Sequence, residues 1–179
     1  TLSRKDPKYV ARAKAIQKAE TERMAGGHPC EAVPAVKDIM HTVKEKYPDA
    51  NHTNTGFGST IFAVKPGDGS AREQAASCQK VLGGWANIAN EYATKRYRSN
   101  LINWGMLPFL IEKGELPFKN LDYLFIPGIK KAVEEKADTI TAYKVGEDGL
   151  TPFTMALGEL TDEERQIILK GCLINYNRV

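Results

Sequence analysis

Two short apolar segments with a helix between them restrict the folds open to this chain more than any other feature of its sequence. Residues 61–64 and 85–89 are each brief, almost wholly apolar and typical of a strand buried on both faces. Residues 71–82, which lie between glycine-rich turns, have the pattern of a helix. Because a strand, a helix and a second strand in this order favour a parallel unit, we predict an α/β fold.

Helices and strands are predicted on both sides of this unit. Residues 7–25 and 33–47 have helical patterns, and the second of these has one apolar face. In the later part of the chain, the pattern predicts a helix over residues 91–103, strands near 107–111 and 123–126, and a short helix over 129–136. A hairpin of residues 139–145 and 154–157 is predicted around Gly146 to Gly149. A capping box of Thr161 and Glu164 begins the last predicted helix. No repeat, low-complexity tract or linker divides the sequence. We therefore expect one domain, with residues 1–58 as its helical part and residues 59–179 as its core.

The balance of charge limits the partners that the chain is expected to have. With 25 Lys and Arg against 22 Asp and Glu, the formal net charge is only +3, and the charges are spread along the chain. Charge therefore indicates neither a nucleic-acid partner nor a membrane. No apolar stretch reaches the roughly 18 residues of a membrane span, and the first residues lack the apolar core of a signal peptide.

The cysteines and histidines give no pattern of a metal or disulfide site. The cysteines, odd in number and far apart, are Cys30, Cys78 and Cys172. His28, His41 and His52 lack an i, i+4 partner, and we interpret them as surface or core residues. We therefore expect a reducing, cytoplasmic compartment and no metal bound by this chain.

The stretch with the most chemical information is residues 67–76, between the first predicted strand and its helix. Ser70 and Glu73 have the spacing of a capping box, so Ser70 is predicted to accept a hydrogen bond from the first helical turn. Glycines on both sides of Asp68 let backbone N–H groups approach a ligand closely. The helix N-terminus that follows favours an anion.

Arg72 is the residue in this stretch that points beyond a simple helix cap. It lies in the first helical turn, where the helix dipole disfavours a positive charge by roughly 0.3–1 kcal/mol. A bound carboxylate or phosphate would reverse that penalty, and the arginine fork matches a carboxylate with two hydrogen bonds. Spacing alone leaves open whether Arg72 binds such an anion, points into solvent, or pairs with Asp68 or Glu73.

Motifs in this region resemble those of a known family. Residues 69–76 read G-S-A-R-E-Q-A-A and resemble the G-S-S-R-E-H-A-A segment in the C-terminal swivel domain of aconitase and its relatives. Residues 98–108 read R-S-N-L-I-N-W-G-M-L-P and resemble the R-S-N-L-I-x-x-G-V-L-P segment of that domain. The leucine, two glycines and short strand at residues 82–89 are also similar. The resemblance spans roughly residues 59–177, and residues 1–58 match only in being helical.

The resemblance implies a swivelling three-layer β/β/α domain with an N-terminal helical segment. In this family the swivel domain closes over an iron-sulfur active site, so a 4Fe-4S cluster is expected in other domains and not in this chain. The implied partners are those domains of the same polypeptide and a small hydroxy polycarboxylate substrate. We therefore expect a piece of a larger hydro-lyase, similar to aconitate hydratase, that is inactive alone.

The resemblance also assigns roles to individual residues. Ser70 stands in the place of the serine base that removes the Cα proton of the substrate, and Arg72 in that of an arginine that binds a substrate carboxylate. Gly69 and Ala71 stand beside them at substrate-binding positions. The positions implied for support of the loop or for docking are Asp68 and Asn100, although an asparagine at a helix end is more often a local cap.

Departures from the family pattern leave the substrate open. Ala71 replaces a serine that can donate a hydrogen bond to the substrate, and Gln74 replaces a histidine, so citrate is not implied. The second substrate-binding arginine of the family comes from a segment well before the motif. It is not matched to Arg4, Arg12 or Arg23.

Two alternatives remain open from the sequence. One is a separate small subunit that binds a large subunit, as in isopropylmalate or homoaconitate dehydratases, and the N-terminal helices and residues 100–108 argue against it. The other is a non-catalytic module that binds an anion or RNA. The low net charge and the absence of a basic stripe argue against that module.

Overall fold

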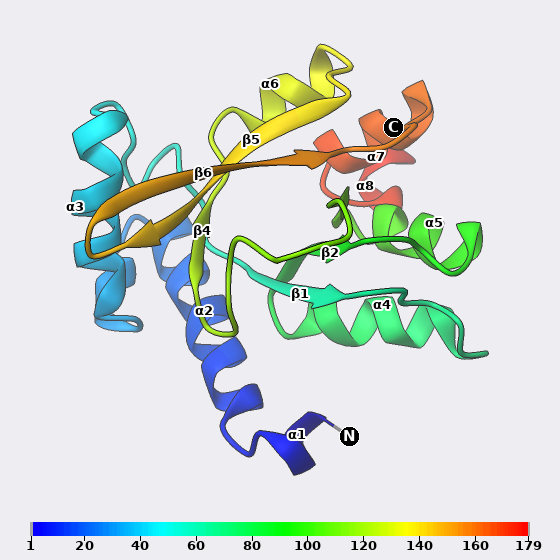
Figure 1. Ribbon diagram of the computed structural model, residues 1–179, viewed down its shortest axis with the longest axis horizontal. Coiled ribbons are helices and arrows are strands. Elements are labelled where there is room, and N and C mark those ends of the chain that lie inside the picture. The colour runs from blue at the N-terminus through cyan, green and yellow to red at the C-terminus, as the bar shows by residue number, and fades with distance from the viewer. Residues whose placement is uncertain (1, 179) are drawn as a thin grey trace.

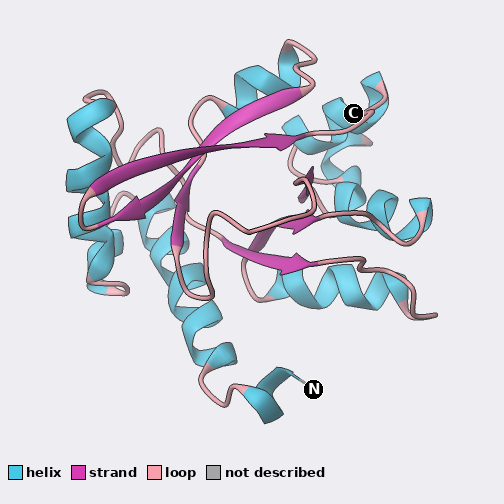
Figure 2. Cartoon of the chain, viewed as in Figure 1, coloured by secondary structure: helices cyan, strands magenta, loops and turns pink. Residues whose placement is uncertain are grey.

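The predicted strand, helix and strand form the parallel half of a six-stranded sheet. The computed structural model describes residues 2–178. In chain order, the elements of this half are β1 (Ser59–Ala63), α4 (Arg72–Val81), β2 (Gly84–Ala89), α5 (Lys95–Asn103) and β3 (Leu107–Leu110). β1 pairs with β2, and β2 with β3, in parallel. The predicted α/β class is therefore confirmed, and each parallel connection contains a helix (Figures 1 and 2).

The other half of the sheet is antiparallel and contains the predicted hairpin. Its strands are β4 (Tyr123–Phe125), β5 (Thr139–Gly146) and β6 (Gly149–Ala156). Pairing of β5 with β6 continues to Gly146 opposite Gly149, so β6 begins earlier than the pattern predicts. The strand order is β1-β2-β3-β6-β5-β4, and the two halves meet where Leu110 pairs with Ala156.

The two halves of the sheet pack against each other and enclose the main core. Residues of β2, β3, β5 and β6 contribute to one apolar cluster, which includes Ala86, Ile88, Phe109, Ile140, Ala142 and Met155. Phe118 bridges the halves, with ring centroids 6.0 Å from Phe62 of β1 and 5.6 Å from Phe153 of β6. Because side chains alternate along a strand, Asn87 lies on the opposite face of β2 and faces α4 and α5. Helices, parallel strands and antiparallel strands thus form three successive layers, as a β/β/α domain requires.

Helices dominate the chain before β1, as predicted. They are α1 (Leu2–Lys5), α2 (Tyr9–Met24), the 3-10 helix η1 (Pro29–Glu31) and α3 (Ala35–Lys46). The two glycines end α2 as the sequence indicated: Gly26 has a φ of 80°, and the Gly27 N–H donates to the Glu22 carbonyl at 2.8 Å. α3 packs on the antiparallel half, where the Tyr47 hydroxyl donates to the Tyr143 hydroxyl at 2.9 Å.

Short helices complete the fold after the antiparallel strands begin. They are α6 (Ile129–Glu134), α7 (Asp162–Leu169) and α8 (Leu173–Tyr176). The predicted capping box is present, since the Glu164 N–H donates to Thr161 Oγ at 3.1 Å and the Thr161 N–H donates to Glu164 Oε2 at 2.9 Å. No helix in residues 2–178 combines the length and apolar character that a membrane crossing needs.

Two local predictions are wrong. Trp85 was expected in a fully buried strand, but it is 40 % exposed, and its ring lies over Gly56 and Gly58, where any Cβ would clash with it. The helix predicted from residue 91 begins only at Lys95, after Thr94 caps it by accepting from the Tyr97 N–H at 3.2 Å. Before Thr94, the N–H groups of Glu91 and Ala93 donate to carbonyls of the segment that follows β1, not to a helix.

Candidate functional site

Residues 67–72 form a loop at the carboxyl end of β1, beside the loop that joins β2 to α5. Three interactions join residues 64–66, just before the first loop, to the second loop: the Glu91 N–H to the Val64 carbonyl (3.1 Å), the Ala93 N–H to the Pro66 carbonyl (2.9 Å), and Lys65 Nζ to Glu91 Oε1 (2.8 Å). The carboxyl ends of parallel strands are where open α/β sheets bind ligands. This edge of the sheet therefore is a candidate functional site.

Gly67 fixes the shape of the first loop. Its φ of 97° disfavours any other residue, and an added Cβ would clash with the Tyr97 side chain. The Gly67 carbonyl accepts hydrogen bonds from Arg72 Nε at 3.1 Å and from Thr94 Oγ at 3.3 Å. One backbone oxygen thus holds the arginine of the first loop and the threonine of the second loop together.

Arg72 forms neither of the ion pairs that its position in the sequence left open. It does not pair with Asp68 or Glu73, and the Glu73 carboxylate instead accepts from Trp104 Nε1 at 3.2 Å. Arg72 is half-buried and anchored through Nε alone. Within residues 2–178, no acceptor binds its two terminal nitrogens, which leaves both for a carboxylate to bind.

Ser70 does not cap the helix, so the predicted capping box with Glu73 is wrong. α4 begins at Arg72, its N-cap residue is Ala71 with φ −87° and ψ 57°, and no side chain caps its first turn. Ser70 lies one residue too early for that hydrogen bond. It is exposed, as are Asp68, Gly69 and Ala71, and its hydroxyl has no partner in the described chain. The first-turn N–H groups of α4 consequently lack a side-chain cap.

A hollow of about 270 Å³ lies next to this loop. Its lining residues are Asn90, Glu91, Tyr92, Thr94, Lys95, Arg98 and Leu110. Thr94 lines the hollow and donates to the Gly67 carbonyl, so the hollow borders the loop at Gly67, whereas Ser70 and Arg72 do not line it. Arg98 is held by the Glu159 carbonyl at 2.6 Å and by Glu164 Oε1 at 3.3 Å.

Sequence reasoning gave no role to the residues of this hollow. One signal could have found it: Lys95, Arg96 and Arg98 lie near the N-terminus of α5, where the helix dipole disfavours positive charge. Arg72 has the same unfavourable placement on α4. Both helices begin at the same edge of the sheet, so the cations of both gather there.

A buried polar cluster beneath the loops ties α4, α5 and β2 together. The Tyr97 hydroxyl donates to Asn87 Oδ1 at 2.8 Å and accepts from Gln79 Nε2 at 3.0 Å, and Asn87 Nδ2 donates to Gln79 Oε1. Burial raises the pKa of Tyr97, and it raises the pKa of the neighbouring Tyr92 as well. These neutral, hydrogen-bonded groups fix the relative positions of the two helices that carry Arg72 and Thr94.

Comparison with known proteins identifies the family. The family model described as the aconitase C-terminal domain matches residues 14–114. This chain belongs to the aconitase C-terminal domain family. The matched range begins within α2, so it reaches further toward the N-terminus than the motifs indicated, and it includes both loops of the candidate site. No curated protein matches the chain.

Asn100 and the arginines near α2 are further positions that the family resemblance concerns. Asn100 lies in the last turn of α5, and its side chain makes no hydrogen bond in residues 2–178, so it is not the local cap that was expected. Arg12 pairs with Asp6, and Arg23 pairs with Glu20 at 2.6 Å, which raises the pKa of Arg23. Both arginines are thus engaged with carboxylates near α2.

The residues of this aconitase-family domain do not suit a metal cluster. Within residues 2–178, no three or more His, Cys, Asp or Glu side chains are grouped to hold a metal ion. Cys30 and Cys172 are half-buried and Cys78 is exposed, and all three are free thiols. A 4Fe-4S cluster therefore finds no ligand set among these residues.

Proposed function

We propose that this chain is the swivel domain of an aconitase-like hydro-lyase and supplies Ser70 and Arg72 to an active site that other domains complete. The proposed reaction is the reversible dehydration of a hydroxy polycarboxylic acid. One observation carries the proposal: an exposed hydroxyl and two unbound guanidinium nitrogens lie two residues apart at the carboxyl edge of the parallel strands. Family membership supports it.

Arg72 binds and orients the substrate in this proposal. Its Nε is held by Gly67, so its terminal nitrogens face a carboxylate with little rotational freedom left to lose. As the α-proton leaves, negative charge spreads onto that carboxylate. A bidentate guanidinium binds this transition state more strongly than the ground state, which is the condition for catalysis.

Ser70 acts as the base. Its deprotonated Oγ takes the Cα proton, the C–H electron pair forms the double bond, and the hydroxyl of the adjacent carbon takes a proton from an acid in the other domains and leaves as water. An alcohol is a weak acid, so its alkoxide needs positive potential nearby. The uncapped first turn of α4 and the Arg72 guanidinium supply that potential.

The iron-sulfur cluster belongs to another part of the enzyme in this proposal. When bound there, it supplies a Lewis acid for the leaving hydroxyl. The contribution of this chain is confined to the base, the carboxylate site and the shape of the loop. Gly69 leaves space open beside the base, since an added Cβ would meet no atom within 4 Å. Asp68 remains a proposed support residue, and Asn100 a proposed docking residue.

The experiment replaces Ser70 by alanine in the complete enzyme. Loss of a general base is expected to lower kcat by about 100-fold or more with little change in KM. Ser77→Ala is the matched control, because Ser77 lies on the same helix and its hydroxyl donates to the Gln74 carbonyl at 3.3 Å. A Ser70→Ala enzyme with wild-type kcat would remove Ser70 from the mechanism.

A further inference from the structure

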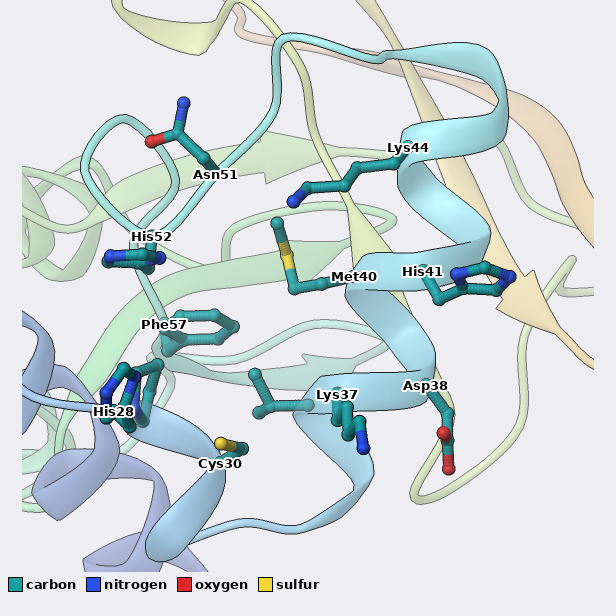
Figure 3. Close-up of a pocket in the computed structure, with 12 residues that line it drawn as sticks. His28, Cys30, Lys37, Asp38, Met40, His41, Lys44, Asn51, His52 and Phe57 are labelled. Atoms are coloured by element: carbon teal, nitrogen blue, oxygen red, sulfur yellow. The ribbon is translucent and has the colours of Figure 1, made fainter.

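A second hollow, of about 350 Å³, lies between α3 and residues 51–57 (Figure 3). α3 is at the opposite end of the molecule from the loop that joins β1 to α4 (Figure 1). All three histidines of the chain line this hollow, although their spacing in the sequence gave no sign of it. Its volume is in the range of small-molecule sites.

The floor of the hollow is apolar and belongs to the core between α2 and α3. Met40 and Phe57 pack against buried Ala19, Val33 and Val36. Figure 3 shows Met40 and Phe57 between the two walls of the hollow. A ligand that enters the hollow therefore rests on side chains that the fold already holds in place.

The wall that carries His52 and Phe57 is held by an ion pair of α2. Arg23 Nη2 lies 2.6 Å from Glu20 Oε1, and the two side chains are only 16 % and 11 % exposed. Arg23 Nη1 donates to the His52 carbonyl at 3.1 Å, and Glu20 Oε2 accepts from the Phe57 N–H at 2.9 Å. Both ends of the segment are thus bound to one helix.

Asn51 stiffens the same wall from within. Its Oδ1 accepts from the Thr53 N–H at 2.8 Å, and its Nδ2 donates to the Asp49 carbonyl at 2.9 Å. The Asn51 side chain is consumed by these contacts and holds the turn that presents His52. Rigid presentation of a binding group reduces the entropy lost when a ligand binds.

The polar side chains left for a ligand are one cation, Lys44, and two imidazole rings, each of which can donate a hydrogen bond. The rings of His28 and His52 lie together, with centroids 6.4 Å apart, and the Lys44 side chain reaches across the hollow from α3 (Figure 3). Within residues 2–178, the side chains of these three residues have no hydrogen bond or ion pair. The acid of the lining, Asp38, points away, as does His41 (Figure 3).

We propose that this hollow binds a small organic anion, a carboxylate or phosphate group attached to an aromatic body. The anion lies between Lys44 and the rings of His28 and His52, and the aromatic body lies on Met40 and Phe57. Lys44 disfavours a cation at this position. The absence of a ligand group for a metal ion in residues 2–178 also favours an organic anion over a metal. The site is separate from Ser70 and Arg72.

Titration of the full chain with benzoate, phenyl phosphate and uncharged benzamide, followed by NMR or calorimetry, tests the proposal. We expect saturable binding of benzoate or phenyl phosphate, and at least roughly fivefold weaker binding of benzamide. The tighter of the two anions identifies the anionic group. Equal binding of benzamide, or no saturable binding of either anion, overturns the proposal.

Substitutions of residues that line the hollow test whether the ligand binds there. Lys44→Gln and His52→Asn are each expected to weaken anion binding by roughly five- to tenfold. The matched controls are Lys37→Gln and His41→Asn on α3, which also border the hollow but whose side chains point away from the two rings in Figure 3. All four residues are exposed, so the variants should keep the fold. Equal losses in the variants and their controls would contradict the proposed site.

Discussion

Arg72→Lys in the complete enzyme separates the arginine fork from its positive charge. Arg72 Nε is already bound to the Gly67 carbonyl at 3.1 Å, and its two terminal nitrogens have no acceptor in residues 2–178. A lysine keeps one positive charge, but it loses the planar pair of donors and the tie to Gly67. The substrate carboxylate would then be bound by a flexible amine that cannot make two parallel hydrogen bonds to it.

The size of the effect follows from the number of hydrogen bonds lost. A hydrogen bond to a charged group contributes about 1.5–3 kcal/mol, and the lysine removes one of the two that the fork makes with a carboxylate. Each 1.4 kcal/mol is about tenfold, so kcat/KM is expected to fall roughly 10- to 150-fold. The lost bond to Gly67 costs only about 0.5–1.5 kcal/mol of unfolding free energy, so the domain stays folded.

Initial rates measured from the absorbance of the unsaturated product test this expectation over a panel of hydroxy polycarboxylates. Arg96→Lys is the matched control, because Arg96 is an exposed arginine in the first turn of α5 with no ion pair in the described chain. A thermal unfolding curve for each variant separates lost activity from lost fold. If Arg72→Lys matches Arg96→Lys in kcat/KM, the carboxylate-binding role of Arg72 is wrong.

Three further predictions concern stability. Gly67→Ala should lower the unfolding free energy, measured in urea, by about 2–4 kcal/mol, because φ is 97° at this position and the added Cβ clashes with Tyr97. The control, Gly69→Ala, adds a Cβ that meets nothing within 4 Å and should change the unfolding free energy by less than about 1 kcal/mol, so equal effects would contradict the clash. Thr161→Ala should cost about 1 kcal/mol in the same assay, since it removes the capping box of α7, and no change would show that the box is not stabilising. The unfolding free energy should fall as the pH rises above 10.0, because burial raises the pKa of Tyr92 and Tyr97 above that ordinary value and the unfolded chain releases their protons first. Tyr92→Phe should make the unfolding free energy fall less steeply with pH, and an unchanged dependence on pH would refute the explanation.

Local patterns in the sequence predicted much of the fold. The brief apolar strands, the glycines that end α2, the hairpin and the capping box of α7 each depend on residues close together in the chain, and each is present. The motif around Ser70 and Arg72 predicted the family that the comparison found. Predictions of element ends were less accurate, as at α5, because contacts with a distant segment set where that helix begins.

Two motifs with the same capping-box spacing have different outcomes in the structure. Thr161 has the extended backbone that a cap needs, with φ −70° and ψ 162°, and its box forms. Ser70 has the same spacing to a glutamate, but the Gly67 carbonyl is bound to Arg72 and Thr94, and α4 starts one residue too late for Ser70 to cap it. The start of α4 at Arg72 therefore leaves the Ser70 hydroxyl free.

The sequence by itself determined the order of helices and strands, the turns and the membership of a family, because these depend on spacing along the chain. Only the tertiary structure decided which side chains meet. It brought His28 and His52 together across a hollow, left the terminal nitrogens of Arg72 unbound and exposed Trp85. Such contacts depend on the packing of segments far apart in sequence, and residue spacing within one segment does not specify which side chains of another segment it meets.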